Sequence, residues 1–560
     1  MNHTALIECV PNFSEGRDLG IIKKITDEIA SVDGVKLLDV EPGKATNRTV
    51  VTFVGPPDAV IQAAFLAISK AGELIDMSKH KGEHPRMGAT DVCPLIPISG
   101  ISMEETVQYA LKLAEMVGTK TNIPVYLYEE AAKTPERKNL ATIRAGEYEG
   151  LANKLNDPYW TPDFGKAVFN SRAGATVIGA RDFLVAYNVN LNTTSVRRAN
   201  SVAFDVRENG RIKIDPVSGK NMTDEYGNTL REPGLCPSVK AIGWFIEEYG
   251  IAQISMNLTN INVTSLHTAF DACCVSAQDR GLRVTGSELV GLVPKKVLLD
   301  AGKYFLHKQG RSTGVSEQEI IHIAIKTLGL DELSAFDPKK KIIEYLLQDD
   351  TNNLIDLNLV EFSNLTASEN PAPGGGSVSA YVGTLGVSLG TMVANLGANK
   401  KGWDDKINYF SEWAEKGQLI KDELLTLVDA DTIAFNQILE AVRLPKETEV
   451  DKDLRKKAMH LATKGAIIVP LQVMRTSFKA LDLIKEMAIN GNQSSVSDAG
   501  VGGLCCRTAI QGAYLNVQIN CKGFQDVTFV DTSLKEANEL YTKALELEKE
   551  IVDIVLKSMG

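Results

Sequence analysis

The sequence predicts a multidomain protein in which two α+β subdomains, each a ferredoxin-like βαββαβ unit, present facing sheets and precede an all-α helical bundle. Two observations support this fold class. Strand and helix patterns follow the order β-α-β-β-α-β twice before residue 290. After about residue 352 the strand patterns disappear and long helical patterns replace them. We therefore expect subdomains at 1–176 and 177–328, a linker at 329–352 and a helical domain at 353–560.

Hydrophobic periodicity and local stop signals place the individual elements. Asp18 is the expected N-cap of the first helix, and Pro56-Pro57-Asp58 opens the second. The first subdomain should contain strands at 5–9, 35–40, 49–54, 92–98 and 125–128, and helices at 18–30, 57–76 and 103–117. The second should contain strands at 176–190, 239–246, 251–257 and 283–289, and helices at 193–207 and 264–280. Helices should follow at 354–365, 377–399, 407–441, 452–490, 501–521 and 534–558.

The composition of the 560 residues is that of a globular protein, with 44% hydrophobic and 23% charged residues. The net charge of -11 argues against a general affinity for nucleic acid or for anionic membranes. None of the eight cysteines forms a Cys-x-x-Cys pair, which favours free thiols in a reducing cytoplasm. The uncharged stretch 377–399 is rich in glycine and serine, so we expect a buried bundle helix there and no membrane span.

The segment from His80 to Asp91 concentrates titratable groups on an irregular loop, as a proton-transfer site requires. His80, Glu83 and His84 also fit the H-x-x-E-H metal motif, but Gly82 and Pro85 disfavour the helix that this motif needs. A solvated polar loop is a further alternative. His84 is the natural proton carrier and His80 a supporting residue.

Three other residues are expected to line the same groove. They are Asp39 at a strand end and Asn47-Arg48 in the next loop, where Arg48 suits a carboxylate substrate. The glycine-bounded segment 165–174 suits close approach of backbone to a flat ligand. On spacing alone, a plain linker between subdomains explains that segment better.

Two features stand out in the helical part. Ala372-Pro373-Gly374-Gly375-Gly376-Ser377 opens a helix whose exposed amides suit an anion, although a simple helix cap explains the same pattern. Asp429 and Asp431 lie two residues apart in an apolar helix, so at most one of them faces a given cleft. Burial would raise the pKa of that carboxyl. Two solvated acids are the alternative, and Asn516 is a weaker candidate.

Longer motifs resemble one known family over nearly the whole chain. The segments 8–16, 46–50, 53–57 and 80–91 are similar to glutamate formiminotransferase (glutamate formimidoyltransferase). The segments 372–378, 427–431 and 512–517 resemble its partner, formimidoyltetrahydrofolate cyclodeaminase. The order of the motifs is that of the bifunctional formiminotransferase-cyclodeaminase family.

The resemblance implies a transferase and lyase of histidine degradation that uses N-formimino-L-glutamate and polyglutamylated tetrahydrofolate as small-molecule substrates. It further implies no required metal and a homo-oligomer. Its catalytic residues fall on His84 and Asp431. Its folate-binding residues fall on Gly165, Lys166, Ala167, Val168, Phe169, Asn170, Ser171, Arg172, Ala173 and Gly174. A metal-dependent hydrolase using His80, Glu83 and His84, and a non-catalytic folate-binding protein, are the alternatives.

Overall fold

The computed structural model describes residues 5–44, 46–82, 85–347 and 353–560, which form two compact units. The sheet unit holds the described residues up to Ala301 together with those from Ile325 to 347. The helical unit holds Gly302–Ala324 and the described residues after 352. The two expected α+β subdomains and the helical C-terminal part are thus confirmed.

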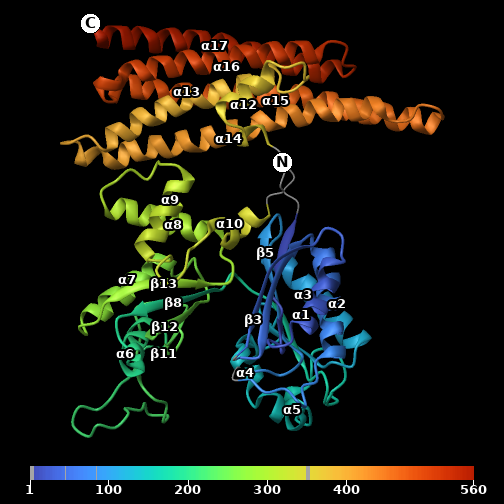
Figure 1. The fold of residues 1–560 in the computed structure, drawn as a ribbon, viewed down its shortest axis with the longest axis vertical. Coiled ribbons are helices and arrows are strands. Elements are labelled where there is room, and N and C mark those ends of the chain that lie inside the picture. Colours follow the sequence, from blue (N-terminus) through green and yellow to red (C-terminus); the bar gives the residue numbers. More distant parts are fainter. Residues whose placement is uncertain (1–4, 45, 83–84, 348–352) are drawn as a thin grey trace. The chain divides into compact units, whose positions relative to one another are not determined.

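The first sheet of the sheet unit has seven strands in the spatial order β3-β4-(β1, β2)-β5-β7-β6. Helices α1, α2 and α3 cover one of its faces (Figure 1). Antiparallel β3, β4, β1 and β5 reproduce the ferredoxin-like order, and β7 and β6 extend the sheet in parallel with β5. The bounds are β1 Leu6–Cys9, β2 Asn12–Phe13, α1 Leu19–Ala30, β3 Lys36–Gly43, β4 Arg48–Gly55, α2 Pro57–Leu74, β5 Thr90–Ser99, α3 Met103–Lys120, β6 Val125–Glu129 and β7 Thr176–Ala180.

The second sheet has four antiparallel strands in the order β11-β12-β8-β13. Its chain order β-α-β-β-α-β gives the same strand arrangement as the first sheet, which confirms that the two halves share one plan. Its elements are β8 Val185–Leu191, α6 Val196–Val206, β11 Val239–Ile246, β12 Ile251–Leu258, α7 Leu266–Gln278 and β13 Val284–Val290. A short hairpin, β9 Arg211–Ile212 and β10 Arg231–Glu232, lies between α6 and β11.

Two strand predictions were wrong in part. The single strand expected at 176–190 is two strands that belong to different sheets: β7 pairs with β5 and β6, whereas β8 pairs with β12 and β13. The strand expected at 35–40 is longer: β3 continues through Glu41-Pro42-Gly43, and Pro42 lies opposite Thr49. Proline is tolerated there because β3 pairs only with β4 and is an edge strand.

Several short elements were not expected from the sequence, among them the helices α4 Leu140–Arg144 and α5 Glu147–Leu155, which position site residues described below. The others are α8 Lys295–Lys308, α9 Glu317–Leu328 and α10 Pro338–Lys341. The short helix α11 Ile343–Leu346 lies in the segment expected as a helical linker. The segment between α8 and α9 packs in the helical unit. There Ser312 Oγ donates a hydrogen bond to Asn395 Oδ1 at 2.6 Å, and Asn395 Nδ2 donates to Gly314 O at 2.9 Å. The expected domain boundaries stay predictions.

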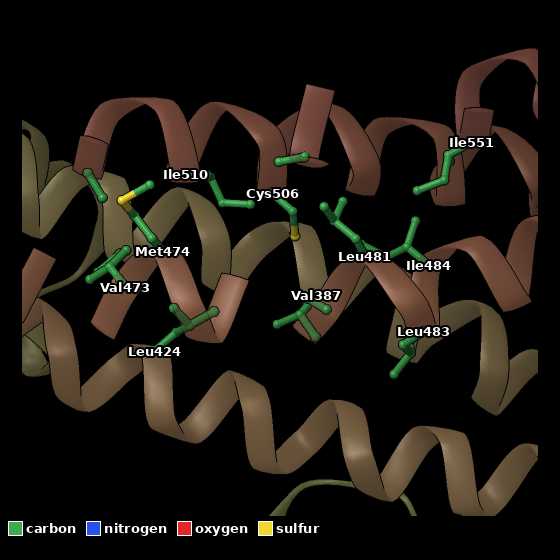
Figure 2. Packing of buried hydrophobic residues seen from close by; sticks show 14 of the residues in the cluster. Val387, Leu424, Val473, Met474, Leu481, Leu483, Ile484, Cys506, Ile510 and Ile551 are labelled. Atoms are coloured by element: carbon green, nitrogen blue, oxygen red, sulfur yellow. The ribbon is translucent and has the colours of Figure 1, made fainter. Parts of the chain in front are cut away.

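The helical unit is built from long helices that run side by side (Figure 1). They are α12 Leu359–Thr366, α13 Gly375–Ala398, α14 Ile407–Arg443, α15 Glu449–Asn490, α16 Val496–Cys521 and α17 Val527–Met559. Figure 2 shows residues from several of these helices, such as Val387, Leu424, Leu481 and Ile510, meeting in one apolar core. Small residues on α13 and α16 let the helix backbones approach closely, as at Gly386, which leaves no room for a side chain against Cys506.

Helix α13 is long and apolar enough to cross a membrane, and it is the one described helix that meets this test. Its most apolar window is 61% buried inside the structure. It packs against α14, α15 and α16, which gives it the environment of a core helix. This packing is the one expected for residues 377–399.

Candidate active sites

A cavity of about 1090 Å³ lies in the sheet unit and is lined by both sheets. Because strands of either sheet supply its walls, the two sheets face each other across it, as expected. Val50 and Thr52 of β4 and Val92 of β5 line it from the first sheet, and Ala186 of β8, Lys240 of β11 and Asn257 of β12 line it from the second. A polar cavity of this size between two sheets accommodates a folate-sized ligand.

The loop from His80 to Asp91 reaches this cavity, since Pro85 is part of the cavity wall. The expected catalytic His84 and its neighbour Glu83 lie outside the described residues. His80 is fixed by its surroundings: Arg86 Nε lies 3.2 Å from its Nδ1, and its Nε2 lies 2.9 Å from the Asn47 carbonyl oxygen. Arg86 can only donate, so Nδ1 accepts this hydrogen bond, and Nε2 lies within hydrogen-bond distance of the carbonyl oxygen. Both ring nitrogens are therefore occupied, and His80 supports the loop.

Arg86 connects this loop to helix α5. It is 7% exposed, and its guanidinium forms a bidentate pair with Glu149, at 2.9 and 2.7 Å, and a further bond to Glu147 at 3.0 Å. The hydrogen bond to Glu149 is the largest effect on Arg86 and raises its pKa. The Tyr148 N–H also donates to the Arg86 carbonyl at 2.8 Å. These contacts fix the chain direction immediately after Pro85.

Arg48 lines the cavity, in agreement with the role expected for it. Burial lowers the pKa of Arg48 to about 10, and the nearby Asp91 opposes this shift. Asp91 itself is 1% exposed, forms an ion pair with Arg144 and accepts a hydrogen bond from Met87 N at 3.0 Å. Arg144, on the unexpected helix α4, is a second cation of the cavity wall. Two arginines thus line the space available to an anionic substrate, and the Arg144 guanidinium is bound to Asp91.

The two neighbours expected beside Arg48 have other positions. Asn47 accepts from Gly16 N at 3.0 Å and donates to Lys81 O at 3.0 Å, so its amide joins two loops. Among the described residues, the cavity wall includes Glu41 and not Asp39. The two residues lie on the same face of β3, opposite Val50 and Thr52 of β4. The expectation that Asp39 lines the cavity was therefore wrong, and Glu41, two residues farther along the strand, lines it instead.

The glycine-bounded segment 165–174 docks on the loop that carries Met87 and Ala89. Met77 N donates to Arg172 O at 2.9 Å, and Ala89 N donates to Ala173 O at 2.8 Å. Gly174 has a φ of 68°, and a Cβ there would overlap the Met87 carbonyl oxygen. The structure therefore brings this segment against the His80–Asp91 loop, although its residues are not among those that line the cavity.

The middle of the same segment is exposed. Val168 is 64% exposed and Phe169 is 37% exposed. The Phe169 ring lies 5.6 Å from the ring of Tyr148, and the Tyr148 hydroxyl donates to the Ser171 carbonyl at 2.5 Å. An exposed aromatic pair on a backbone held at both ends is a surface on which a planar ring system can stack. The folate-binding role of residues 165–174 stays a prediction.

In the helical unit the structure separates the two aspartates of α14. Asp429 accepts a hydrogen bond from Leu354 N at 2.6 Å. Asp431 accepts from Ser377 N at 2.9 Å and from Ser377 Oγ at 3.3 Å, at the start of α13. Burial is the main effect on Asp431 and raises its pKa, and the two Ser377 bonds oppose it. Asp431 thus faces the glycine-rich start of α13, while Asp429 accepts a hydrogen bond from the backbone of Leu354.

The amide of Asn516 lies at the same helix start as Asp431. Its side chain lies close to the position that a Cβ on Gly375 would occupy, with Nδ2 3.5 Å away. Asn516 Nδ2 donates to Gly512 O at 2.9 Å, which leaves its oxygen as an acceptor. Helices α13, α14 and α16 therefore contribute a glycine backbone, a carboxyl and an amide to one place. The described residues contain no group of three or more His, Cys, Asp or Glu side chains that could hold a metal ion.

Three family models match consecutive parts of this chain. Residues 6–181 match the formiminotransferase domain, N-terminal subdomain, residues 186–348 match the formiminotransferase domain, and residues 358–539 match formiminotransferase-cyclodeaminase. The formimidoyltransferase-cyclodeaminase of Mus musculus is 42% identical over 541 residues, which are 96% of either chain. The chain belongs to the formiminotransferase-cyclodeaminase family.

Shorter relatives with other names each match only a part of this family member. The glutamate formimidoyltransferase of Thermoplasma acidophilum is 43% identical over 312 residues, which are 55% of this chain and 95% of that protein. The methenyltetrahydrofolate cyclohydrolase of Methylorubrum extorquens is 34% identical over 189 residues, which are 34% of this chain and 91% of that protein. The family membership expected from the sequence motifs is confirmed.

Sequence reasoning missed several polar residues of the cavity wall, including Glu8, Arg144 and Arg181. Glu8 was recognisable, because it alternates with Ile7 and Cys9 in β1, and both neighbours are buried on the helix-covered face of the sheet. Arg144 gave no such signal. It is placed by a five-residue helix that hydrophobic periodicity does not reveal.

Proposed function

We propose that this protein is a bifunctional folate enzyme with one active site in each unit. The sheet unit transfers the formimino group of N-formimino-L-glutamate to N5 of tetrahydrofolate and releases L-glutamate. The helical unit cyclises the resulting 5-formiminotetrahydrofolate to 5,10-methenyltetrahydrofolate and releases ammonia. Tetrahydrofolate is a co-substrate, and no step requires a metal. The observation that carries the proposal is the presence of a polar site in each of two units, together with the match of residues 6–181 and 186–348 to formiminotransferase models and of residues 358–539 to the formiminotransferase-cyclodeaminase model.

In the first reaction, N5 of tetrahydrofolate attacks the formimino carbon and the bond from that carbon to the glutamate nitrogen breaks. One proton moves from N5 to the departing nitrogen, and His84 is our candidate to carry it. Arg48 and Arg144 supply cations for the carboxylates of the substrate. Each assisted proton transfer accelerates such a reaction by roughly two to four orders of magnitude.

In the second reaction, N10 of the folate attacks the formimino carbon and the bond to the terminal nitrogen breaks, which releases ammonia. The proton lost from N10 must reach the leaving nitrogen. Asp431 suits this task, because burial raises its pKa and makes the carboxyl an easier proton acceptor and donor near neutral pH. The Asn516 oxygen and the Ser377 hydroxyl are close enough to hold the reacting group.

The exposed segment 165–174 is our proposed folate platform in the sheet unit. Phe169 and Tyr148 offer aromatic faces, while Lys166 and Arg172 offer positive charge for an anionic polyglutamate tail. A tail-tethered intermediate would pass between the two sites at high effective concentration. We further propose that the enzyme acts in histidine degradation, in the cytoplasm and as a homo-oligomer.

The decisive experiment follows methenyltetrahydrofolate absorbance with N-formiminoglutamate and tetrahydrofolate supplied to the purified protein. His84→Ala should block the first step and leave cyclisation of supplied 5-formiminotetrahydrofolate intact. Asp431→Ala should do the reverse. If either folded variant lost both steps, the two-site assignment would be wrong. If the wild-type protein bound folate without turnover, the protein would be a non-catalytic folate binder.

The metal-hydrolase alternative gains no support from the described residues. Both ring nitrogens of His80 are engaged by protein atoms, so His80 offers no lone pair to a metal in this arrangement. If added zinc proved stoichiometric and chelators abolished the transferase activity, that alternative would replace the present proposal.

A further inference from the structure

Glu8 is an acidic residue of the cavity wall for which the reaction described above has no task. It lies at the centre of the first sheet, on β1, opposite Val54 of β4 and Ile96 of β5. Its neighbours Ile7 and Cys9 are fully buried on the helix-covered face. Alternation along the strand directs Glu8 to the opposite face, where it lines the cavity while remaining only 4% exposed.

The Glu8 carboxylate has no hydrogen bond or ion pair with any residue that the structure describes. Two other acids of the same wall are paired: Glu41 lies 3.5 Å from Lys341 Nζ, and Glu147 lies 3.0 Å from Arg86 Nη1. Arg181 is near enough to lower the Glu8 pKa, but its Nη1 donates to the Asp182 carbonyl at 2.8 Å.

Burial is the larger effect on Glu8 and raises its pKa to about 7. A buried carboxylate without a partner is costly in free energy, and the cost falls when a cation binds beside it. The buried Glu8 carboxylate therefore favours the binding of a positively charged group in the cavity.

The substrate of the proposed transferase reaction carries such a group. Its formimino nitrogen–carbon–nitrogen unit is an amidine, which is protonated at neutral pH and presents N–H donors in a planar fork. A carboxylate matches that fork as it matches an arginine guanidinium. The two carboxylates of the substrate need cations instead, and Arg48 and Arg144 lie in the same wall.

We propose that Glu8 binds the formamidinium group of N-formimino-L-glutamate in the cavity whose wall also holds Arg48 and Arg144. This inference rests on the transferase function proposed above. The transferred group is again an amidinium in 5-formiminotetrahydrofolate, so one carboxylate serves substrate and product. By holding the proton on the formimino nitrogen, Glu8 keeps the carbon electrophilic towards N5.

The test compares Glu8→Gln with Glu130→Gln, which removes the same charge from a more exposed position in the same wall. Initial rates give KM for N-formimino-L-glutamate, and inhibition gives Ki for N-formyl-L-glutamate, which keeps both carboxylates but is neutral at the formyl group. Glu8→Gln should raise KM by roughly 10–100-fold, the value of a charge-assisted hydrogen-bond pair, and change Ki by less than about threefold. Glu130→Gln should change neither by more than that.

If Glu8 had only a structural role, Glu8→Gln would weaken the binding of substrate and inhibitor alike. That result, or an unchanged KM, would overturn the inference. Glu8→Asp keeps the charge and provides a second variant; it should recover most of the lost affinity for N-formimino-L-glutamate. If wild-type protein shows no transfer at all, the proposed function fails. If wild-type turns over and Glu8→Gln equals it, only the role of Glu8 fails.

Discussion

The Asp431 carboxylate occupies the space beside Gly376 where any other residue would place its Cβ. The close approach lets the next residue, Ser377, donate its N–H to that carboxylate at 2.9 Å. A glycine on α13 and an acid on α14 are thus matched to each other. The glycine run that opens α13 therefore admits the Asp431 side chain to the helix start.

Gly376→Ala should reduce cyclodeaminase activity by about 100-fold, because the new methyl group must push the Asp431 carboxyl away by about an ångström. Transferase activity should stay unchanged, since it resides in the other unit. Gly374→Ala is the matched control, because its Cβ would meet nothing nearer than the Pro371 carbonyl oxygen at 3.9 Å. If both variants lost cyclodeaminase activity equally, the activity would depend on the backbone at the start of α13 and not on the position of the Asp431 carboxyl. Both activities can be followed by absorbance with the separate substrates.

Asp431→Asn should lower the cyclisation rate by roughly 100-fold or more while raising stability at pH 8. The folded pKa of Asp431 is raised by burial, so the native state binds this proton more tightly than the unfolded chain does. Ionisation therefore destabilises the fold as the pH rises from the ordinary value of 3.8 through the folded pKa. The stability advantage of asparagine should be full above that range and shrink towards pH 4. Urea unfolding at pH 5 and pH 8 measures it.

Asp429→Asn is the control for Asp431→Asn. An asparagine oxygen can still accept the Leu354 N–H, so this variant should keep cyclodeaminase activity within a few-fold of wild type. If Asp429→Asn lost activity as severely as Asp431→Asn, the assignment of the acid to Asp431 would be wrong.

Gly174→Ala should raise KM for tetrahydrofolate by roughly 10–100-fold in the transferase reaction. Its φ of 68° disfavours alanine, and the added methyl would overlap the Met87 carbonyl, so the segment 165–174 must leave its docking position. Gly150→Ala, in α5 of the same unit, has open space around its Cβ. This control should leave KM for tetrahydrofolate unchanged and should leave stability unchanged or slightly higher. An unchanged KM for tetrahydrofolate in folded Gly174→Ala would exclude segment 165–174 from folate binding.

Arg86→Lys should lower transferase kcat/KM by about tenfold or more and destabilise the sheet unit by about 1–3 kcal/mol. Lysine cannot reproduce the bidentate pair with Glu149 together with the bond to His80 Nδ1, so the loop that carries Pro85 loses its support. Arg17→Lys, at an exposed arginine of the same unit, should have little effect. Kinetics and thermal unfolding check both, and preserved transfer by Arg86→Lys would show that the loop is held by other contacts.

The sequence was informative wherever local chemistry decides the outcome. Asp18 caps α1 as expected, with its side chain accepting from Gly20 N and Ile21 N. The long apolar periodicities after residue 353 gave the bundle helices, and glycines on α13 marked close helix packing. In contrast, residues 176–190 contain two β-prone runs separated by a short break at 179–182. That break was the only local signal, and nothing local revealed that the two runs belong to different sheets.

The sequence by itself determined the two repeated βαββαβ plans, the helical C-terminal part, the family, and the fact that Asp429 and Asp431 cannot face one cleft together. The family follows from the resemblance of long motifs, and the other properties follow from hydrophobic periodicity and residue spacing along the chain. Only the tertiary structure decided that Leu354 N donates a hydrogen bond to Asp429 and that Ser377 N donates one to Asp431, because those partners are far apart in the chain. It alone also placed Glu8 and Arg48 in one cavity, since that cavity exists only when two sheets face each other.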